Sequence, residues 1–440
     1  MKKNIIKTII PLKNFILLWL GQSLSQFGTA MTSFALIIWV FKRQGTVMSI
    51  ALLSVFSYLP YVIAGLLAGV VIDRFQKKKI MLICNTIATI CSLCAFILMY
   101  LGFLQVWHIY LINAVSGFVN AFQSPAFKVS IRLIVPKEHY TRVSGLQSLS
   151  DSITSMMTPI LATIVLSILG INIIFCIDLI TRTIGFFSLL FFVKIPYTNT
   201  DRDNKKKRPN CACEILQGFS YLNQNKGFLY LVLFMTVINF LAAMSFYSVL
   251  PAIILARTSN NEQILGLVTG SIGLGGIVGG LIVSAVKPPK NRVKTIFASL
   301  ALSFLLCDIL LGTGRNVFVW IFGAFIGNLP LPFFNASENS LLYSKIPINM
   351  QGRIFSIRGT FQSFALCIGY LTGGFLADKI FEPLMISSEK ARYIMGGIVG
   401  VGRGSGMAII FIITGILGFA LSIILYNNKA IRDLNSMIDQ

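Results

Sequence analysis

Residues 65–83 read GLLAGVVIDRFQKKKIMLI, a stretch that places one acid and four bases between two apolar runs. The five charges lie within seven residues, from Asp73 to Lys79. A soluble protein could present such a segment as a charged loop, whereas a membrane protein uses it as a topological anchor between two spans. The composition of the rest of the chain decides between these interpretations.

The chain has the composition of an integral membrane protein. It has 440 residues, of which 55% are hydrophobic and 12% charged, and its mean hydropathy is +0.79, outside the range of soluble domains. Apolar windows of about 20 residues, the length that crosses a bilayer, recur along it. We expect these windows to be helices, because backbone polar groups in lipid must be satisfied internally. The twelve expected spans are 15–41, 47–72, 80–101, 108–134, 142–167, 171–193, 228–256, 264–286, 295–314, 317–344, 353–377 and 407–426.

The basic residues that give the chain its net charge of +22 fall mostly on one side of the expected membrane. Of the 37 Lys and Arg residues, 25 fall on the side of the N-terminus, 8 on the opposite side and 4 inside expected spans. This bias is the positive-inside rule, and it predicts that both termini are cytoplasmic. The basic tract 205–208 is therefore interpreted as part of a cytoplasmic loop, and we expect no nucleic-acid partner.

The chain lacks the side chains that a membrane enzyme would need. Its only two histidines, His108 and His139, stand near the ends of expected spans, and no cysteine spacing fits a metal site. The glycine-rich stretches contain no nucleotide-binding motif. The sequence thus predicts no catalytic residues, no metal and no enzymatic activity.

An internal repeat divides the chain into two similar halves. A shift of 211 residues places Gly65 on Gly276, and Arg142 on Arg353. Six spans per repeat return the chain to the same face of the membrane, so the halves are parallel repeats, an arrangement that transporters use around a central site. We expect an all-α protein with six-helix bundles at 1–193 and 228–440, joined by a cytoplasmic linker at 194–227.

The opening stretch, of the form Gly69-x-x-x-Asp73-Arg74-x-x-Lys77-Lys78, resembles the signature of the major facilitator superfamily. Further stretches resemble the macrolide-efflux (Mef-type) branch of its drug:proton antiporters. These are SYLPYVIAGLLAGVVIDR at 57–74, AFQSPAFKVSIRLIVPKEHY at 121–140, LNQNKGF at 222–228 and GRIFSIRGT at 352–360.

The resemblance implies a twelve-helix fold that alternates between inward-open and outward-open states. It implies export of an amphipathic small molecule, of a drug or macrolide type, in exchange for protons, with the proton motive force and no cofactor as the energy source. We expect a monomeric multi-pass protein in the lipid bilayer of a bacterial cell membrane. Two alternatives remain open: a transporter, importer or exporter, of another metabolite, and a membrane sensor or partner protein that does not transport.

The resemblance also implies a gate near the cytoplasmic start of the eleventh span. It places the Gly69, Asp73 and Arg74 segment beside Arg353 there. A helix N-terminus presents unpaired N–H groups, so the Asp73 carboxylate would gain roughly 0.3–2 kcal/mol and latch the gate in one of two states. The alternative is that this loop only sets topology.

Charges inside spans are candidates for proton coupling, because they are costly in lipid. Glu338 lies about 10 Å inside the tenth span by helical rise, and Arg358, at similar depth in the eleventh, is its expected partner. Protonation of Glu338 would then break the pair and couple proton entry to the gate; a permanent salt bridge is the alternative. Asp151 lies about 13 Å into the fifth span, with Lys128 and Arg132 as expected neighbours, and is open to the same two interpretations.

Other intramembrane charges are interpreted as structural. Asp178 and Arg182 are four residues apart on the sixth span and should neutralise each other, and Asp308 belongs to the ninth span. The resemblance puts the substrate cavity on the first, fourth, seventh and tenth spans, where amides among apolar walls suit an amphipathic ligand. The candidate substrate-binding residues are Gln22, Gln26, Asn120, Gln123, Asn239, Asn335 and Asn339.

Overall fold

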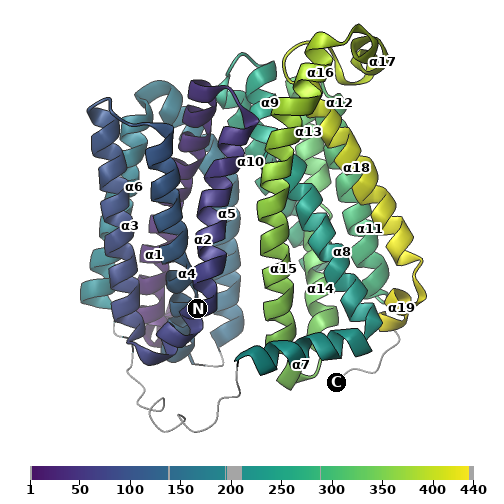
Figure 1. Ribbon diagram of the computed structural model, residues 1–440. Coiled ribbons are helices and arrows are strands. Elements are labelled where there is room, and N and C mark those ends of the chain that lie inside the picture. The colour runs from purple at the N-terminus through teal and green to yellow at the C-terminus, as the bar shows by residue number, and fades with distance from the viewer. Residues whose placement is uncertain (1, 137–138, 194, 196–210, 288, 436–440) are drawn as a thin grey trace. The chain divides into compact units, whose positions relative to one another are not determined.

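The computed structural model describes residues 2–136, 139–193, 195, 211–287 and 289–435, and every regular element among them is helical. Side chains are not described for 2–13, 66–67, 69–70, 73–74, 141–142, 211–215 and 348–349. The chain forms two compact units (Figure 1), of which unit 1 comprises Met1–Val40 and Leu53–Arg208 and unit 2 comprises Phe41–Leu52 and Pro209–Gln440. The last residues of the first helix and the first residues of the second therefore group with unit 2.

Unit 1 is built from six long helices. They are α1 (Lys2–Gln44), α2 (Val47–Arg74), α3 (Lys77–Tyr100), α4 (Val106–Ile134), α5 (Tyr140–Leu169) and α6 (Ile171–Phe187), the last continued by a π-helical segment at Ser188–Phe192.

Unit 2 contains six further spans, several of them interrupted. Its helices are α8 (Lys226–Ala242), α9 (Leu250–Arg257), α10 (Glu262–Ala285), α11 (Arg292–Ser303), α12 (Ile309–Thr313), α13 (Val317–Asn328), α14 (Leu331–Lys345), α15 (Ile348–Phe375), α16 (Glu382–Ser387) and α18 (Ser405–Tyr426). Short π-helical segments at Ala243–Tyr247, Phe304–Asp308 and Leu376–Phe381 join consecutive pieces. Figure 1 shows α7 (Cys211–Gln224) across one end of unit 2 and α17 (Glu389–Val399) at the opposite end, and α19 (Lys429–Arg432) and a 3-10 turn at Asp433–Asn435 follow α18.

Eleven helices among the described residues are long and apolar enough to cross a membrane. Each overlaps one of the twelve spans expected from the sequence. The remaining expected span, 108–134, is the 29-residue helix α4. It is long enough to cross a bilayer, but amides and the charged residues Lys128 and Arg132 make it less apolar than the others. Its length and its packing on α3 place it with the spans.

The packing of the two units repeats, as the internal sequence repeat predicts. In unit 1 the third span, α3, packs on the fourth, α4, and the sixth, α6. In unit 2 the ninth span, which begins with α11, packs on the tenth through α14 and on the twelfth, α18. The same relative neighbours at an offset of six spans are what parallel repeats require.

Carboxylates satisfy two helix N-termini within unit 2. Asp378, just beyond α15, accepts hydrogen bonds from the backbone N–H groups of Val47 and Met48 at the start of α2, at 2.9 and 2.8 Å. Glu382 accepts from Gly406 at 2.9 Å and Met407 at 3.3 Å in the first turn of α18. Both contacts satisfy donors that a helix start leaves unpaired and place negative charge at the positive end of the helix dipole.

Helices α2 and α4 cross at a glycine in unit 1. A Cβ atom added to Gly117 would lie 2.0 Å from the carbonyl oxygen of Ser57 and 3.2 Å from its Cα. Both are backbone atoms of the facing helix, so they cannot turn away as a flexible side chain could. The close approach of the two helices therefore requires glycine at position 117.

We predict that Gly117→Ala destabilises the protein by about 1–3 kcal/mol or more, because overpacking forces the α2 and α4 backbones apart. The thermal unfolding midpoint of the detergent-solubilised protein measures the effect. Gly65→Ala on α2 is the matched control, since its Cβ would meet nothing within 4 Å and alanine favours a helix over glycine by roughly 0.5–1 kcal/mol. An unchanged midpoint for Gly117→Ala would contradict the assigned crossing.

Candidate functional site

Unit 1 contains a partly open cavity of about 740 Å³, lined by residues from α1 to α6. This volume lies in the range of about 300–1,000 Å³ that accommodates drug-sized ligands. Serine and threonine hydroxyls and the aromatic rings of Trp19, Tyr58 and Tyr61 contribute to the wall. The amides that line it are Gln22, Gln26, Asn113, Asn120, Gln123 and Gln147.

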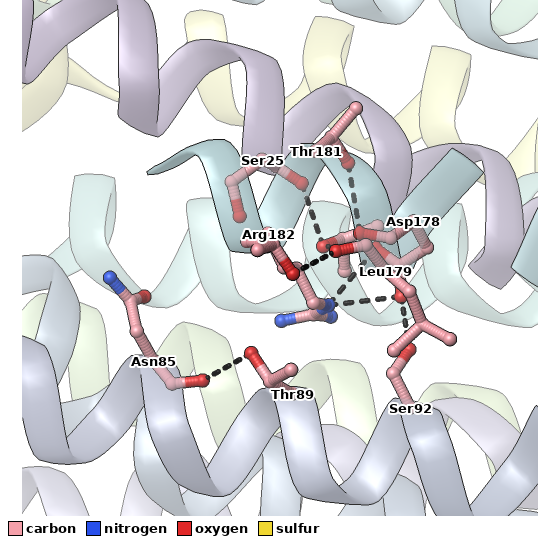
Figure 2. A network of polar contacts seen from close by, with 10 residues as sticks. Ser25, Asn85, Thr89, Ser92, Asp178, Leu179, Thr181 and Arg182 are labelled. Atoms are coloured by element: carbon pink, nitrogen blue, oxygen red, sulfur yellow. Dashed lines mark hydrogen bonds and ion pairs between the residues drawn. The ribbon is translucent and has the colours of Figure 1, made fainter. Parts of the chain in front are cut away.

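A buried carboxylate connects three helices at the cavity wall (Figure 2). Asp178 on α6 is 1% exposed, and the Nε of Arg182, one turn later, lies 3.0 and 2.9 Å from its two oxygens. Thr29 Oγ1 on α1 lies 3.1 Å from Oδ1, and the hydroxyl of Ser92 on α3 donates to Oδ2. The carboxylate thus has three donor groups, one each on α1, α3 and α6, which compensate for its removal from water.

A second network connects α1, α3 and α4. The side-chain amide of Gln123 donates to the Oε1 of Gln22 at 3.0 Å and to the Oδ1 of Asn85 at 2.7 Å. One α4 residue thereby fixes the orientation of two amides on two other helices, and all three helices contribute to the cavity wall.

An ion pair lies deep between two spans of unit 2. The Nη2 of Arg358 on α15 lies 2.9 Å from Oε2 of Glu338 on α14, and the side chains are 21% and 2% exposed. The sequence predicted this pair from the similar depths of the two residues. A single hydrogen bond joins them, so protonation of Glu338 would remove the principal contact that favours its ionised form.

A further buried carboxyl in unit 2 has hydroxyl partners. Asp308 is 3% exposed, and its Oδ2 lies 2.8 Å from Thr414 Oγ1 on α18 and 3.3 Å from Ser245 Oγ. Among the described residues no cation comes within ion-pair distance of Asp308. The sequence analysis interpreted Asp308 as structural, and its partners in the structure are hydroxyls rather than a cation.

The structure brings together part of the second proposed coupling group. Asp151 on α5 and Lys128 on α4 both line the unit 1 cavity, and Lys128 acts electrostatically on Asp151. Arg132, the other expected neighbour of Asp151, is exposed and does not line the cavity. Lys128 is therefore the nearer counter-charge for Asp151.

The proposed gate lies mostly outside the side chains that the structure describes. Gly69, Asp73 and Arg74 are among the residues whose side chains are not described, so the latch stays a prediction. Arg353 is described: it lies in the first turns of α15, where its Nη1 is 3.3 Å from the Sδ of Met350. Its Cβ is also close to Gly218 of α7.

The candidate substrate residues divide between the two units. Gln22, Gln26, Asn120 and Gln123 line the unit 1 cavity. In unit 2, Asn239 donates to the carbonyl oxygen of Met235 at 2.8 Å, as a helix-internal contact. Asn335 and Asn339 are exposed on α14.

The sequence interpretation missed that Asp178 and Arg182 belong to the cavity wall. It predicted their mutual neutralisation correctly but interpreted both residues as structural only. The i, i+4 spacing shows that two side chains share a helix face but not which neighbour that face meets. The contacts with Thr29 and Ser92 place this face toward α1 and α3.

Two repeated bundles of membrane-spanning helices, with a drug-sized polar cavity inside one of them, define the chain as a multi-pass membrane transporter. The Major Facilitator Superfamily profile matches residues 18–370. The chain belongs to this superfamily, whose fold the resemblance in the sequence indicated.

Known proteins agree with this assignment. Macrolide efflux protein A of Streptococcus pyogenes is 28% identical over 369 residues, covering 83% of this chain and 90% of that protein. Macrolide efflux protein A of Enterococcus faecalis is 28% identical over 320 residues, covering 72% and 97%. A bacterial homologue of the iron transporter ferroportin shares the fold, with a TM-score of 0.65, 14% identity and coverage of 95% and 99%.

We predict that Gln123→Leu lowers the stability of the protein by about 1–3 kcal/mol, because it leaves two amide oxygens without their donor. Asn120→Leu, on the same helix, is the control. No described group pairs with the Asn120 amide, so its loss should change stability by less than about 0.5 kcal/mol. Thermal unfolding of the two purified variants compares them, and equal midpoints would show that the Gln123 network contributes nothing.

Proposed function

We propose that this protein exports amphipathic small molecules of the macrolide type from the cell in exchange for protons. The observation that carries the proposal is the drug-sized cavity of unit 1, whose wall combines amides, hydroxyls and aromatic rings. Such a wall suits a ligand with both apolar and polar surface. The similarity to macrolide efflux proteins, at 28% identity, supports this substrate class.

In this proposal, export proceeds by alternating access in the cell membrane, with both termini in the cytoplasm. The chain works as a monomer, the proton motive force supplies the energy and no cofactor takes part. Glu338 takes up and releases the proton. When Glu338 is ionised, its pair with Arg358 holds α14 against α15, and when it is protonated this hold is weakened. A ligand or proton can shift such an equilibrium only by its differential affinity for the two states.

The first prediction from this proposal concerns transport in cells. Expression in an efflux-deficient bacterium should raise resistance to erythromycin and lower its accumulation relative to an empty vector. A proton uncoupler should return accumulation to the empty-vector level, because uphill export needs the proton gradient. Uptake of radiolabelled erythromycin measures both effects. Energised accumulation inside the cell would indicate an importer, and identical uptake with and without the protein would favour a membrane protein that does not transport macrolides.

The second prediction concerns Glu338. Glu338→Gln keeps the shape of the side chain and removes the titrating proton, so it should abolish uphill efflux while retaining substrate binding and passive exchange. Efflux of preloaded erythromycin against and down its gradient, in proteoliposomes with an imposed pH gradient, separates these activities.

Glu262→Gln is the matched control for that measurement. It also neutralises an ion-paired glutamate, the partner of Lys42 at the start of α10, and should preserve uphill efflux. Full uphill efflux by Glu338→Gln would transfer the coupling role to Asp151 or Asp308.

A further inference from the structure

The guanidinium of Arg182 is only partly used by its ion pair. Its contact with Asp178 runs through Nε alone, which lies 3.0 and 2.9 Å from the two oxygens. In the usual bidentate arrangement, two nitrogens of the planar fork meet the two carboxylate oxygens. Here the two Nη groups, with four N–H donors, have no partner among the described residues.

These unused donors belong to a residue that the cavity reaches. The side chain of Arg182 is 14% exposed, against 1% for Asp178, and both residues line the cavity. Within the pair it is therefore the cation that a bound molecule can touch. The carboxylate, held by Thr29 and Ser92 from two other helices, fixes the position of the guanidinium.

Two residues of the cavity wall on α1 also carry unpaired donors. The indole Nε1 of Trp19 and the amide Nε2 of Gln22 are buried and have no hydrogen-bond partner among the described residues. Because these two atoms are shielded from the cavity, an acceptor oxygen of a bound molecule would meet the partly exposed guanidinium of Arg182 instead. The formal charges on the wall balance, since Arg182 and Lys128 stand against Asp178 and Asp151, so the acceptor need not be an anion.

We propose that Arg182 is a substrate-recognition residue, whose Nη groups donate hydrogen bonds to an oxygen-rich acceptor group, such as an ester, ketone or sugar oxygen, of the transported compound. Asp178 is its positioning residue. The inference rests on the proposed function, because it takes the unit 1 cavity as the substrate site. A purely structural pair would explain the contact with Asp178 but not the four N–H donors left for the cavity.

The test compares Arg182→Lys with the wild-type full-length protein. Lysine keeps the positive charge beside Asp178 and hence the charge balance of the buried pair, but it lacks the planar fork. Erythromycin and digoxin, two oxygen-rich compounds, serve as probes in equilibrium binding to the purified proteins. We expect Arg182→Lys to weaken the binding of both by about 10- to 100-fold, the loss expected for hydrogen bonds to a charged group, while its thermal midpoint stays close to that of the wild type.

Arg315→Lys is the matched control. The guanidinium of Arg315 donates to the carbonyl oxygen of Gly396 at 3.1 Å, at the end of unit 2 where α17 lies. The Arg315→Lys variant should therefore bind both probes as the wild type does. Wild-type affinity of Arg182→Lys for both probes would overturn the inference, as would failure of the wild-type protein to bind either probe.

The double variant Asp178→Asn with Arg182→Gln separates recognition from folding. It removes both charges, so no unpaired charge remains buried. We expect it to recover the thermal stability that Asp178→Asn alone loses and to remain defective in binding both probes. Recovery of binding together with stability would show that the pair is only structural.

The outcomes also separate this inference from the proposed function. Arg182-dependent binding of the probes without macrolide export in cells would refute the proposed function and leave the recognition role intact. Macrolide export in cells, together with probe binding that Arg182→Lys does not change, would refute the recognition role and leave the proposed function intact.

Discussion

The packing of unit 1 depends on the buried carboxylate of Asp178. An ionised carboxylate in a membrane-spanning bundle is tolerated only when donors replace the lost water, and here α1, α3 and α6 supply them. Glycine allows the approach that this requires, since a Cβ at Gly28 of α1 would lie 2.1 Å from Oγ1 of Thr181 on α6. The hydrogen bonds to Asp178 and the close approach of α1 to α6 thus depend on each other, and both shape the cavity wall.

Unit 2 also buries a carboxyl group where three of its spans meet, but the acid stands on a different helix of the repeat. Asp308 belongs to the ninth span and meets hydroxyls of the seventh and twelfth, the counterparts of the third, first and sixth spans that meet at Asp178. The repeat offset of 211 residues does not align the two acids, since it pairs Asp308 with Ile97, and Asp178 with Glu389. The repeat therefore preserves which spans meet, whereas the side chain that occupies the meeting point differs. Of these two acids only Asp178 has a cation partner among the described residues, and only Asp178 lines the cavity of unit 1.

Much of this architecture could be predicted from the sequence, because the bilayer imposes a length and an apolar composition that each span must show. Depth along a helix could be predicted for the same reason, and the constant rise per residue brought Glu338 and Arg358 to one level, where the structure pairs them. The rotation of each helix about its own axis could not be predicted from the sequence. Whether Asp178 faces lipid, protein or cavity depends on the neighbouring helices, and a hydropathy window contains no information about them. Gly117 could not be assigned either, since many glycines occur in such spans and only the crossing with α2 shows which one is needed.

The number of donors around each acid bears on which one can carry a proton. Every hydrogen bond to a carboxylate favours its ionised form, and Asp178 has three donor groups, Arg182 Nε and the hydroxyls of Thr29 and Ser92. Its protonation would have to disrupt contacts on three helices at once. Asp308 lacks a cation partner among the described residues, so no charge partner favours its ionised state. Glu338 has a cation partner, which Asp308 lacks, but accepts fewer hydrogen bonds than Asp178, so ionised and neutral forms each have a reason to be populated. A coupling site must visit both forms in every cycle, and the role proposed for Glu338 is consistent with this environment.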